Sequence, residues 1–201
     1  MKRVLLFVVP ILMISTVMLA WKKISPAPQP PHEEIHWITS IDELQAKMKE
    51  NPKKVYIDMY TDWCGWCKKM DVSTFQNPDL IRYMNNNFYA VRFNAETKEV
   101  IHFQGKEYTF KPEYKANTFA VEMMKGTMSY PTAVVMMENF QNPQSIPGYL
   151  TVSQIEPLLT YLGDNAYKHQ AWDAYQKSYT TRWDREMAEP PHASPSSPMG
   201  H

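Results

Sequence analysis

The two cysteines of this chain lie three positions apart, and this pair constrains the fold more than any other feature. Cys64 and Cys67 are the only cysteines among 201 residues. The apolar run 55–60 precedes them, so the order is strand, short loop, Cys-X-X-Cys and helix. Residues at positions i and i+3 of a helical turn point to the same side. The pattern therefore predicts an α/β fold with a dithiol at the start of a helix.

Cys64 should be the more reactive of the two thiols. At a helix start, unpaired backbone N–H groups and the helix dipole stabilise a thiolate, whereas Cys67 should be more buried and less acidic. We expect Cys64 to attack a disulfide and Cys67 to resolve the mixed disulfide that results. The Cys64–Cys67 disulfide would itself be the redox group, with no other cofactor. Half of a zinc site is the alternative, but no second Cys-X-X-Cys or histidine pair completes one.

Asp58 and Pro131 are two further candidate site residues. Asp58 lies in a strand with apolar residues on both faces, which is typical of the centre of a sheet. Burial there should raise its pKa and make it a proton acceptor for Cys67; an edge strand that leaves Asp58 in solvent is the alternative. Pro131 begins another strand, and its spacing alone favours an ordinary trans bond after Tyr130.

The N-terminal segment predicts a domain in the periplasm or another extracytoplasmic compartment. A lysine and an arginine precede an uncharged apolar run from 4 to 21, so residues 1–24 are expected to be a signal peptide or a membrane anchor. A retained anchor would tether the protein to the inner membrane. Residues 25–36 form a proline-rich linker and residues 188–201 a disordered tail by composition. The 21 basic and 21 acidic side chains balance, which gives no basis for nucleic-acid binding.

The remaining chain is expected to form one domain over 37–165 and a helical extension over 166–187. Capping patterns begin helices at Ser40 and Ser153, with Glu43 and Glu156 at the third helical positions, and Asp62 is the expected cap of the helix at 64. The other expected elements are helices over 77–87 and 117–125, strands over 55–60, 88–94, 132–137 and 146–150, and a hairpin over 101–110.

Several of these residues resemble motifs of the thioredoxin superfamily. The segment Trp63-Cys64-Gly65-Trp66-Cys67-Lys68 is similar to its active-site motif, and Asp58 to its buried acid six positions earlier. The segment Tyr130-Pro131-Thr132 is similar to its cis-proline loop. Arg92 stands where many relatives carry a lysine near the buried acid, and Gly148 where they carry a glycine after the last hairpin.

The resemblance implies a central mixed β-sheet flanked by helices, a cis Pro131, and thiol–disulfide exchange with protein clients. Electrons would come from an unidentified donor. The residues expected to meet the substrate are Trp63, Gly65, Trp66, Tyr130 and Pro131. Gly-Trp stands between the cysteines where relatives carry Gly-Pro, Gly-His or Pro-His. Without a histidine there to stabilise the thiolate, a reductant or isomerase is favoured over a strong oxidant.

Two segments and a second hypothesis extend beyond that pattern. The insertion at 98–117 and the extension after 166 could shape partner choice, or cover a sheet edge and an apolar patch. A copper(I)-binding metallochaperone of thioredoxin-like fold is the alternative function, although methionines in helices and strands more often fill a core. A non-catalytic scaffold is a third reading. Besides the two cysteines, the residues that suggest copper binding are His102, Met123, Met124, Met128, Met136 and Met137.

Overall fold

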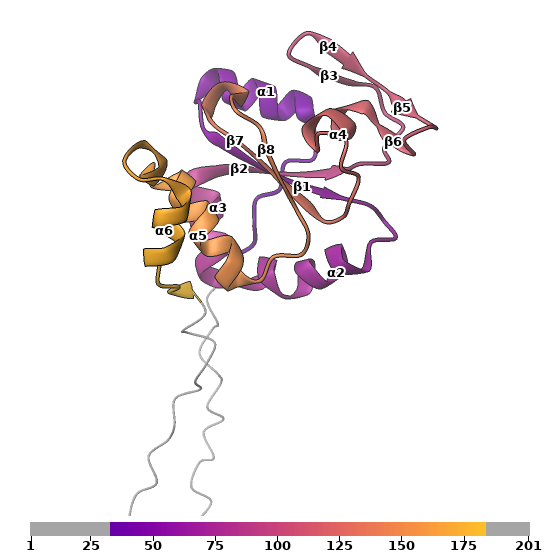
Figure 1. The fold of residues 1–201 in the computed structure, drawn as a ribbon. Coiled ribbons are helices and arrows are strands. Elements are labelled where there is room, and N and C mark those ends of the chain that lie inside the picture. The colour runs from indigo at the N-terminus through magenta and orange to yellow at the C-terminus, as the bar shows by residue number, and fades with distance from the viewer. Residues whose placement is uncertain (1–32, 184–201) are drawn as a thin grey trace, which may run out of the picture. The chain divides into compact units, whose positions relative to one another are not determined.

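A four-stranded mixed sheet organises residues 33–183, the part of the chain that the computed structural model describes (Figure 1). The strand order is β2-β1-β7-β8. β1 (Lys54–Tyr60) runs parallel to β2 (Phe88–Asn94) and antiparallel to β7 (Thr132–Met136), and β7 pairs antiparallel with β8 (Gln144–Pro147). The predicted mixed sheet is confirmed, and β1 lies inside it.

The predictions for residues 1–24, for most of the linker and for the tail fall outside the described residues. None of the helices within residues 33–183 combines the length and the hydrophobicity that a membrane span requires.

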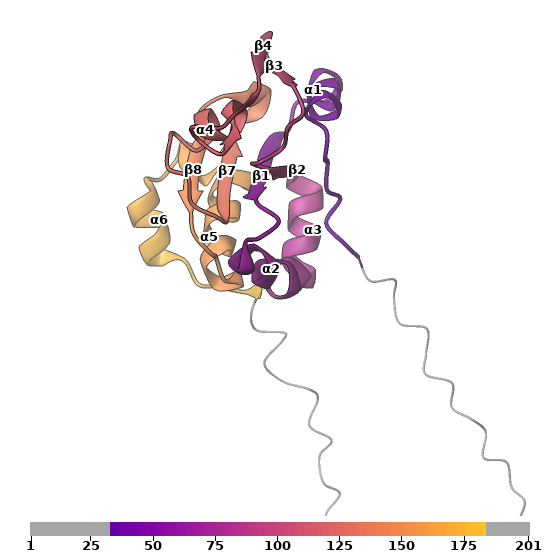
Figure 2. The same ribbon diagram turned by 90° about the vertical axis from the view of Figure 1, so that its right-hand side faces the viewer.

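Helices cover both faces of the sheet (Figures 1 and 2). One hydrophobic cluster joins the sheet to α1 (Ile41–Glu50) and α4 (Thr118–Met123). A second cluster joins the opposite face to α2 (Gly65–Val72), α3 (Pro78–Asn87) and α5 (Val152–Gly163). Burial on both faces explains why β1 is apolar at nearly every position rather than at alternate ones.

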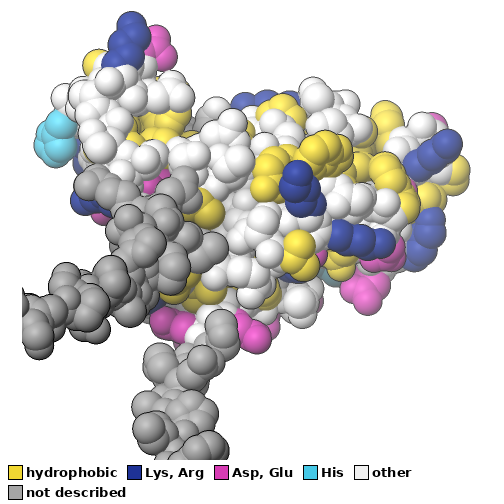
Figure 3. All heavy atoms as spheres, turned by 90° about the horizontal axis from the view of Figure 1, so that it is seen from below, with side chains coloured by type: hydrophobic (Ala, Val, Ile, Leu, Met, Phe, Trp, Pro, Cys, Tyr) yellow, Lys and Arg dark blue, Asp and Glu magenta, His cyan; other side chains and the backbone are white. Residues whose placement is uncertain are grey.

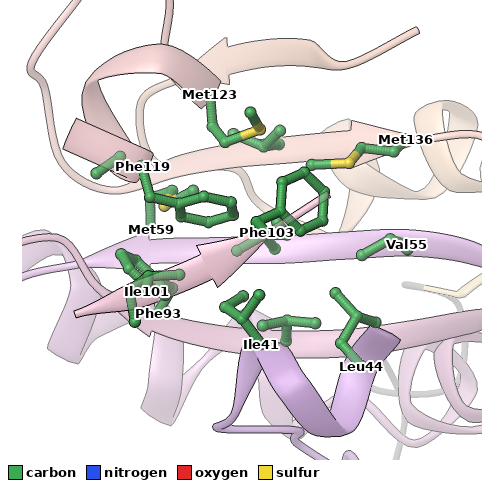
Figure 4. Close-up of a cluster of buried hydrophobic side chains, with 14 of the residues drawn as sticks. Ile41, Leu44, Val55, Met59, Phe93, Ile101, Phe103, Phe119, Met123 and Met136 are labelled. Carbon is green, nitrogen blue, oxygen red and sulfur yellow. The ribbon is translucent and has the colours of Figure 1, made fainter. Parts of the chain in front are cut away.

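Successive residues of β1 point to opposite faces of the sheet. Val55, Ile57 and Met59 belong to the cluster beneath α1 and α4, whereas Tyr56 belongs to the cluster on the α2 side. Figure 4 shows Val55 and Met59 among side chains from α1, α4 and β7. By the same alternation, Asp58 faces the α2 side, which carries the two cysteines.

The insertion forms two small hairpins and contributes to the core. β3 (Ile101–Phe103) pairs with β4 (Lys106–Tyr108), and β5 (Phe110–Lys111) pairs with β6 (Ala116–Asn117). The first hairpin was expected and the second was not. Phe103 and Tyr108 are buried against Phe119 of α4, with ring centroids 5.3 and 5.5 Å from it. The insertion therefore extends the core on the α1 side.

Two of the predicted helix caps are wrong. The Ser40 hydroxyl accepts the N–H of Glu43 as expected. Asp62, however, does not cap α2, because Cys64 itself occupies that position. The last core helix begins after Thr151, which forms a capping box with Gln154 rather than one between Ser153 and Glu156.

Glu156 is unavailable as a cap because it is buried and binds the C-terminal segment. Its carboxylate accepts the hydroxyl of Tyr179 at 2.8 Å and the backbone N–H groups of Arg182 at 2.8 Å and Trp183 at 3.1 Å. Trp183 is buried and packs on Tyr83 of α3. The extension is thus bound to the domain through a carboxylate inside α5.

The extension itself is less helical than predicted. A short 3-10 turn at Ala166–Lys168 precedes α6 (Trp172–Ser178), so the described part of the extension predicted over 166–187 is helical only in part. Asn165 adopts a left-handed backbone conformation with φ of 61°. This conformation prevents α5 from continuing as a helix into the extension. The extension then packs its rings against one another and against α5 in edge-to-face and tilted pairs, formed by Tyr161, Trp172, Tyr175 and Tyr179.

We expect Glu156→Ala to lower the free energy of unfolding by about 3 kcal/mol, because the buried N–H of Trp183, the N–H of Arg182 and the Tyr179 hydroxyl lose their acceptor. Urea denaturation measures this loss. Limited trypsin digestion should also cleave after Lys177 and Arg182 faster than in the wild type. Ser153→Ala, three positions earlier on the same helix, is the control and should cost no more than about 0.5 kcal/mol. Equal stability of the two variants would contradict the assigned anchor.

Candidate active site

The two cysteines form a disulfide at the start of α2. Their sulfurs are 2.10 Å apart and their Cα atoms 5.3 Å apart. Cys64 is the N-cap residue, and its Sγ accepts the backbone N–H of Cys67 at 3.0 Å. Such a contact favours negative charge on this sulfur. The expectation that Cys67 is the more buried is wrong for the disulfide form, since both residues are 3% exposed. The two cysteines differ in hydrogen bonding rather than in burial.

The loop before α2 is held by backbone hydrogen bonds. The N–H of Cys64 donates to the carbonyl of Thr61 at 3.1 Å, and the carbonyl of Cys64 accepts the N–H of Lys68 at 3.2 Å. A Cβ atom at Gly65 would meet no atom within 4 Å. Packing therefore does not demand a glycine between the cysteines, and the chain here lies open to an approaching partner.

Two exposed tryptophans flank the disulfide. Trp63 is 66% exposed and Trp66 56% exposed. The ring of Trp63 meets Tyr130 edge to face at 5.9 Å, so Trp63 contacts the residue before Pro131. Figure 3 shows the face that carries α2, where hydrophobic side chains lie next to basic ones. Large exposed rings of this kind are characteristic of protein-binding surfaces.

The sequence did not single out three polar or aromatic residues that hold these rings. Trp63 Nε1–H donates to both carboxylate oxygens of Glu96, each at 3.1 Å. The ring of Trp66 lies 5.5 Å from that of Tyr149, and the Lys69 ammonium lies 4.8 Å from the Trp66 ring. Glu96 is 33 positions from Trp63, so no local pattern reveals the contact; Lys69 is three positions after Trp66 and could have been found from helical spacing.

The Tyr130–Pro131 peptide bond is cis. The family resemblance predicted this bond correctly, whereas spacing alone favoured trans. The Pro131 carbonyl accepts the N–H of Gly148 at 2.8 Å. Gly148 has a φ of +104°, a conformation that essentially only glycine adopts. Gly148 therefore gives the chain after β8 the turn that reaches the proline loop.

Asp58 occupies the centre of the sheet, paired with Arg92 of β2 and Ala133 of β7, and is 2% exposed. The alternative of an edge position is therefore wrong. Its Oδ2 has no hydrogen-bond partner among the described residues, and the nearest cation is the Arg92 Nε at 3.7 Å. Burial raises the pKa of Asp58 to about 7, while Arg92 lowers it and Asp71 raises it.

Arg92 links the buried acid to α2. Its guanidinium donates to Asp71 Oδ2 at 2.7 Å, a much closer contact than that with Asp58. The guanidinium also lies over the rings of Tyr60 at 4.7 Å and Trp37 at 5.8 Å. Asp71 thus holds Arg92 in an orientation that leaves Asp58 only partly neutralised. Asp71 follows Cys67 by one helical turn, and it was not among the residues predicted for the site.

The histidine and methionines that suggested copper binding do not form a common site. Met123, Met124 and Met136 are buried in the core on the α1 side. His102 is exposed on the β3–β4 hairpin, 3.7 Å from Glu107. Within residues 33–183, no group of three or more His, Cys, Asp or Glu side chains is arranged to hold a metal ion.

Comparisons with known proteins agree with this architecture. A family model described as a thioredoxin-like domain matches residues 41–163, and the chain belongs to this family. The thiol:disulfide interchange protein DsbD of Haemophilus ducreyi is 40% identical over 65 residues, which are 31% of this chain and 11% of DsbD. Spermatogenesis-associated protein 20 of Rattus norvegicus is 27% identical over 70 residues, 35% of this chain and 9% of that protein. The chain thus matches only about a tenth of the length of these relatives.

Among solved structures, a thioredoxin-fold protein from Helicobacter pylori matches with a TM-score of 0.46 and 20% identity. The match covers 63% of this chain and 84% of that one.

The raised pKa of Asp58 makes stability depend on pH. Between about pH 4 and pH 7 the folded carboxyl holds a proton that the unfolded chain releases, so the free energy of unfolding falls as pH rises through this range. We expect oxidised Asp58→Asn to lose this dependence and to exceed the wild type at pH 8 by about 2–4 kcal/mol.

Urea denaturation from pH 4 to pH 8.5 measures the effect. The exposed Asp62→Asn is the matched control and should follow the wild-type curve. A wild-type curve without a decline between pH 4 and pH 7 would show that Asp58 ionises normally.

Proposed function

We propose that this protein is a thiol–disulfide oxidoreductase that acts on protein disulfides outside the cytoplasm. The observation that carries the proposal is the Cys64–Cys67 disulfide at the start of α2, with the Cys67 N–H on the Cys64 sulfur. Membership of the thioredoxin-like family and the partial similarity to DsbD support it. Protein clients fit the exposed Trp63 and Trp66 beside the sulfurs.

In the reduced protein, the Cys64 thiolate attacks one sulfur of a client disulfide. That S–S bond breaks, a client thiolate leaves, and a mixed disulfide forms. Cys67 then gives its proton to Asp58, directly or through water, and attacks the Cys64 sulfur, which releases the second client thiolate. The client gains two electrons and the protein returns to the Cys64–Cys67 disulfide. A thiol donor must then reduce the pair again.

Asp58 suits the proton step because its pKa of about 7 matches neutral conditions. A carboxyl with an ordinary pKa would be a much weaker base for a thiol. The positive charge of Arg92 lowers the pKa of Asp58 and so limits the increase that burial causes.

For the whole chain we propose the order expected from the sequence. Residues 1–24 direct or anchor the protein, and residues 25–36 are a linker. The thioredoxin-like domain spans 37–165, the extension 166–187 and the tail 188–201. The apolar run at 4–21 supports an extracytoplasmic location, with the periplasm as the specific compartment.

The direction of electron flow is proposed to be reducing or isomerising. Gly65 and Trp66 stand between the cysteines, so no histidine there stabilises the Cys64 thiolate. We expect a reduction potential at or below about −180 mV. Equilibration with glutathione redox buffers, followed by tryptophan fluorescence, measures it. A value near −120 mV would instead identify a strong oxidant.

We expect Cys67→Ala to accumulate mixed disulfides with client proteins, because the resolving thiol is missing. Non-reducing gels of cells that produce the variant should show adducts that dithiothreitol removes. Cys64→Ser in the Cys67→Ala background is the control and should show none. Serine is a favourable N-cap residue, so this control keeps the start of α2. Adducts that form in Cys64→Ser with Cys67 retained, and not in Cys67→Ala, would reverse the assigned roles of the two cysteines.

A further inference from the structure

Side chains of opposite charge flank the disulfide, and each is held by an aromatic ring. On one side, the Glu96 carboxylate accepts the indole N–H of Trp63, the residue before Cys64. On the other side, the Lys69 ammonium lies over the rings of Trp66, the residue before Cys67, and Tyr149. Along the start of α2, the carboxylate paired with Trp63 therefore precedes the disulfide, and the ammonium paired with Trp66 follows it.

We propose that this surface selects clients by charge, favouring segments with a basic residue on one side of the reactive cysteine and an acidic residue on the other. The inference rests on the proposed exchange reaction and adds to it the chemistry of the substrate. Glu96 and Lys69 are the specificity-determining residues, with Trp63 and Trp66 as the apolar contacts between them.

The acidic group is ordered before a client arrives. Glu96 is half-buried, and both of its oxygens meet the same indole N–H. Its backbone N–H also donates to the Asn94 side chain at 2.9 Å. Burial raises the pKa of the nearby Tyr130 hydroxyl, and the Glu96 charge raises it further. The negative charge of Glu96 thus interacts with Tyr130, the residue before Pro131.

The basic group is ordered in a comparable way. The Tyr149 hydroxyl lies 3.0 Å from the Ser73 hydroxyl, and the Ser73 hydroxyl donates to the Lys69 carbonyl at 2.6 Å. These contacts tie Tyr149, which follows β8, to α2. Lys69 therefore lies over two rings, of which the Tyr149 ring is tied to α2 through Ser73. Charges held in place before binding lose less entropy on pairing than freely moving side chains do.

The expected selectivity is moderate and depends on salt. A single exposed ion pair changes binding about twofold to fivefold, so two pairs acting together should change the rate about tenfold at low ionic strength. Screening should remove most of the difference at 1 M salt, where the Debye length is about 3 Å.

Synthetic peptides with one cysteine, joined to N-acetylcysteine amide as a mixed disulfide, test the proposal. One peptide carries lysine before and glutamate after the cysteine, a second has the reverse order, and a third is neutral. Single-turnover oxidation of the reduced protein, followed by tryptophan fluorescence, gives the rates. We expect the two charged peptides to differ about tenfold in 20 mM salt.

Charge exchange in the protein should exchange the preference. In Glu96→Lys/Lys69→Glu, the slower charged peptide should become the faster one; the ratio of the two rates is the readout, because the exchange also removes the acceptor of the Trp63 indole N–H. The control Lys111→Glu/Glu113→Lys makes the same exchange on the exposed β5–β6 turn and should retain the wild-type order.

The outcomes separate this inference from the proposed function. Equal rates for both charged peptides in wild type and variant, with the neutral peptide reduced, would overturn the charge selectivity and leave the exchange activity standing. No reaction with any peptide would overturn the proposed function itself. A loss of preference in the β5–β6 control would show that overall charge distribution, and not the two aromatic groups, decides the rate.

Discussion

The burial of the Asp58 carboxyl beneath α2 is the interaction on which the site depends. It requires an interior strand, because only a strand with neighbours on both sides and helices on both faces removes a carboxyl from water so completely. β1 meets this requirement through its pairing with β2 and β7. The same strand ends at Tyr60 and leads directly into the loop that carries Cys64. The geometry that buries the acid therefore also places the dithiol.

Two buried carboxylates in this domain have opposite environments. Glu156 accepts two backbone N–H groups and a hydroxyl, and these donors bind the C-terminal segment to α5. Asp58 Oδ2 has no hydrogen-bond donor among residues 33–183, and Arg92 approaches Asp71 more closely than Asp58. Donors stabilise the charged form of a carboxyl, whereas burial without donors favours the neutral form. Glu156 is therefore suited to a structural role and Asp58 to the exchange of a proton.

Local patterns predicted the elements well because their determinants are local. The alternation in β2, the Ser40 cap and the strand that leads to Cys64 each depend on residues a few positions apart. The fold class followed from the order of these elements and from the family resemblance. The helix N-caps predicted at Asp62 and Ser153 are wrong for the same reason. In each case another residue occupies the N-cap position, and no local sequence pattern indicates it. Cys64 caps α2 with its sulfur, and the Glu156 carboxylate accepts hydrogen bonds from residues 179–183 instead of forming a capping box.

The contacts that shape the site are long-range, and the sequence did not reveal them. Glu96 meets Trp63 across the end of β2, and Tyr149 meets Trp66 from the segment after β8. Asp71 was within reach of local reasoning, since it lies one turn after Cys67 on the same helix, but its effect depends on Arg92 from another strand. Sequence patterns thus located the reactive atoms, while the environment that tunes them required the folded chain.

Capping and chemistry are coupled at the first turn of α2. The Cys64 sulfur caps α2 by accepting the N–H of Cys67, and the same N–H would stabilise a Cys64 thiolate. A thiolate accepts this hydrogen bond more strongly than a disulfide sulfur does, because charge strengthens the contact. Reduction should therefore strengthen the cap, and oxidation should weaken it while the S–S bond restrains the same turn. The helix start is held in both redox states, so Trp63 and Trp66 can keep their positions through the cycle.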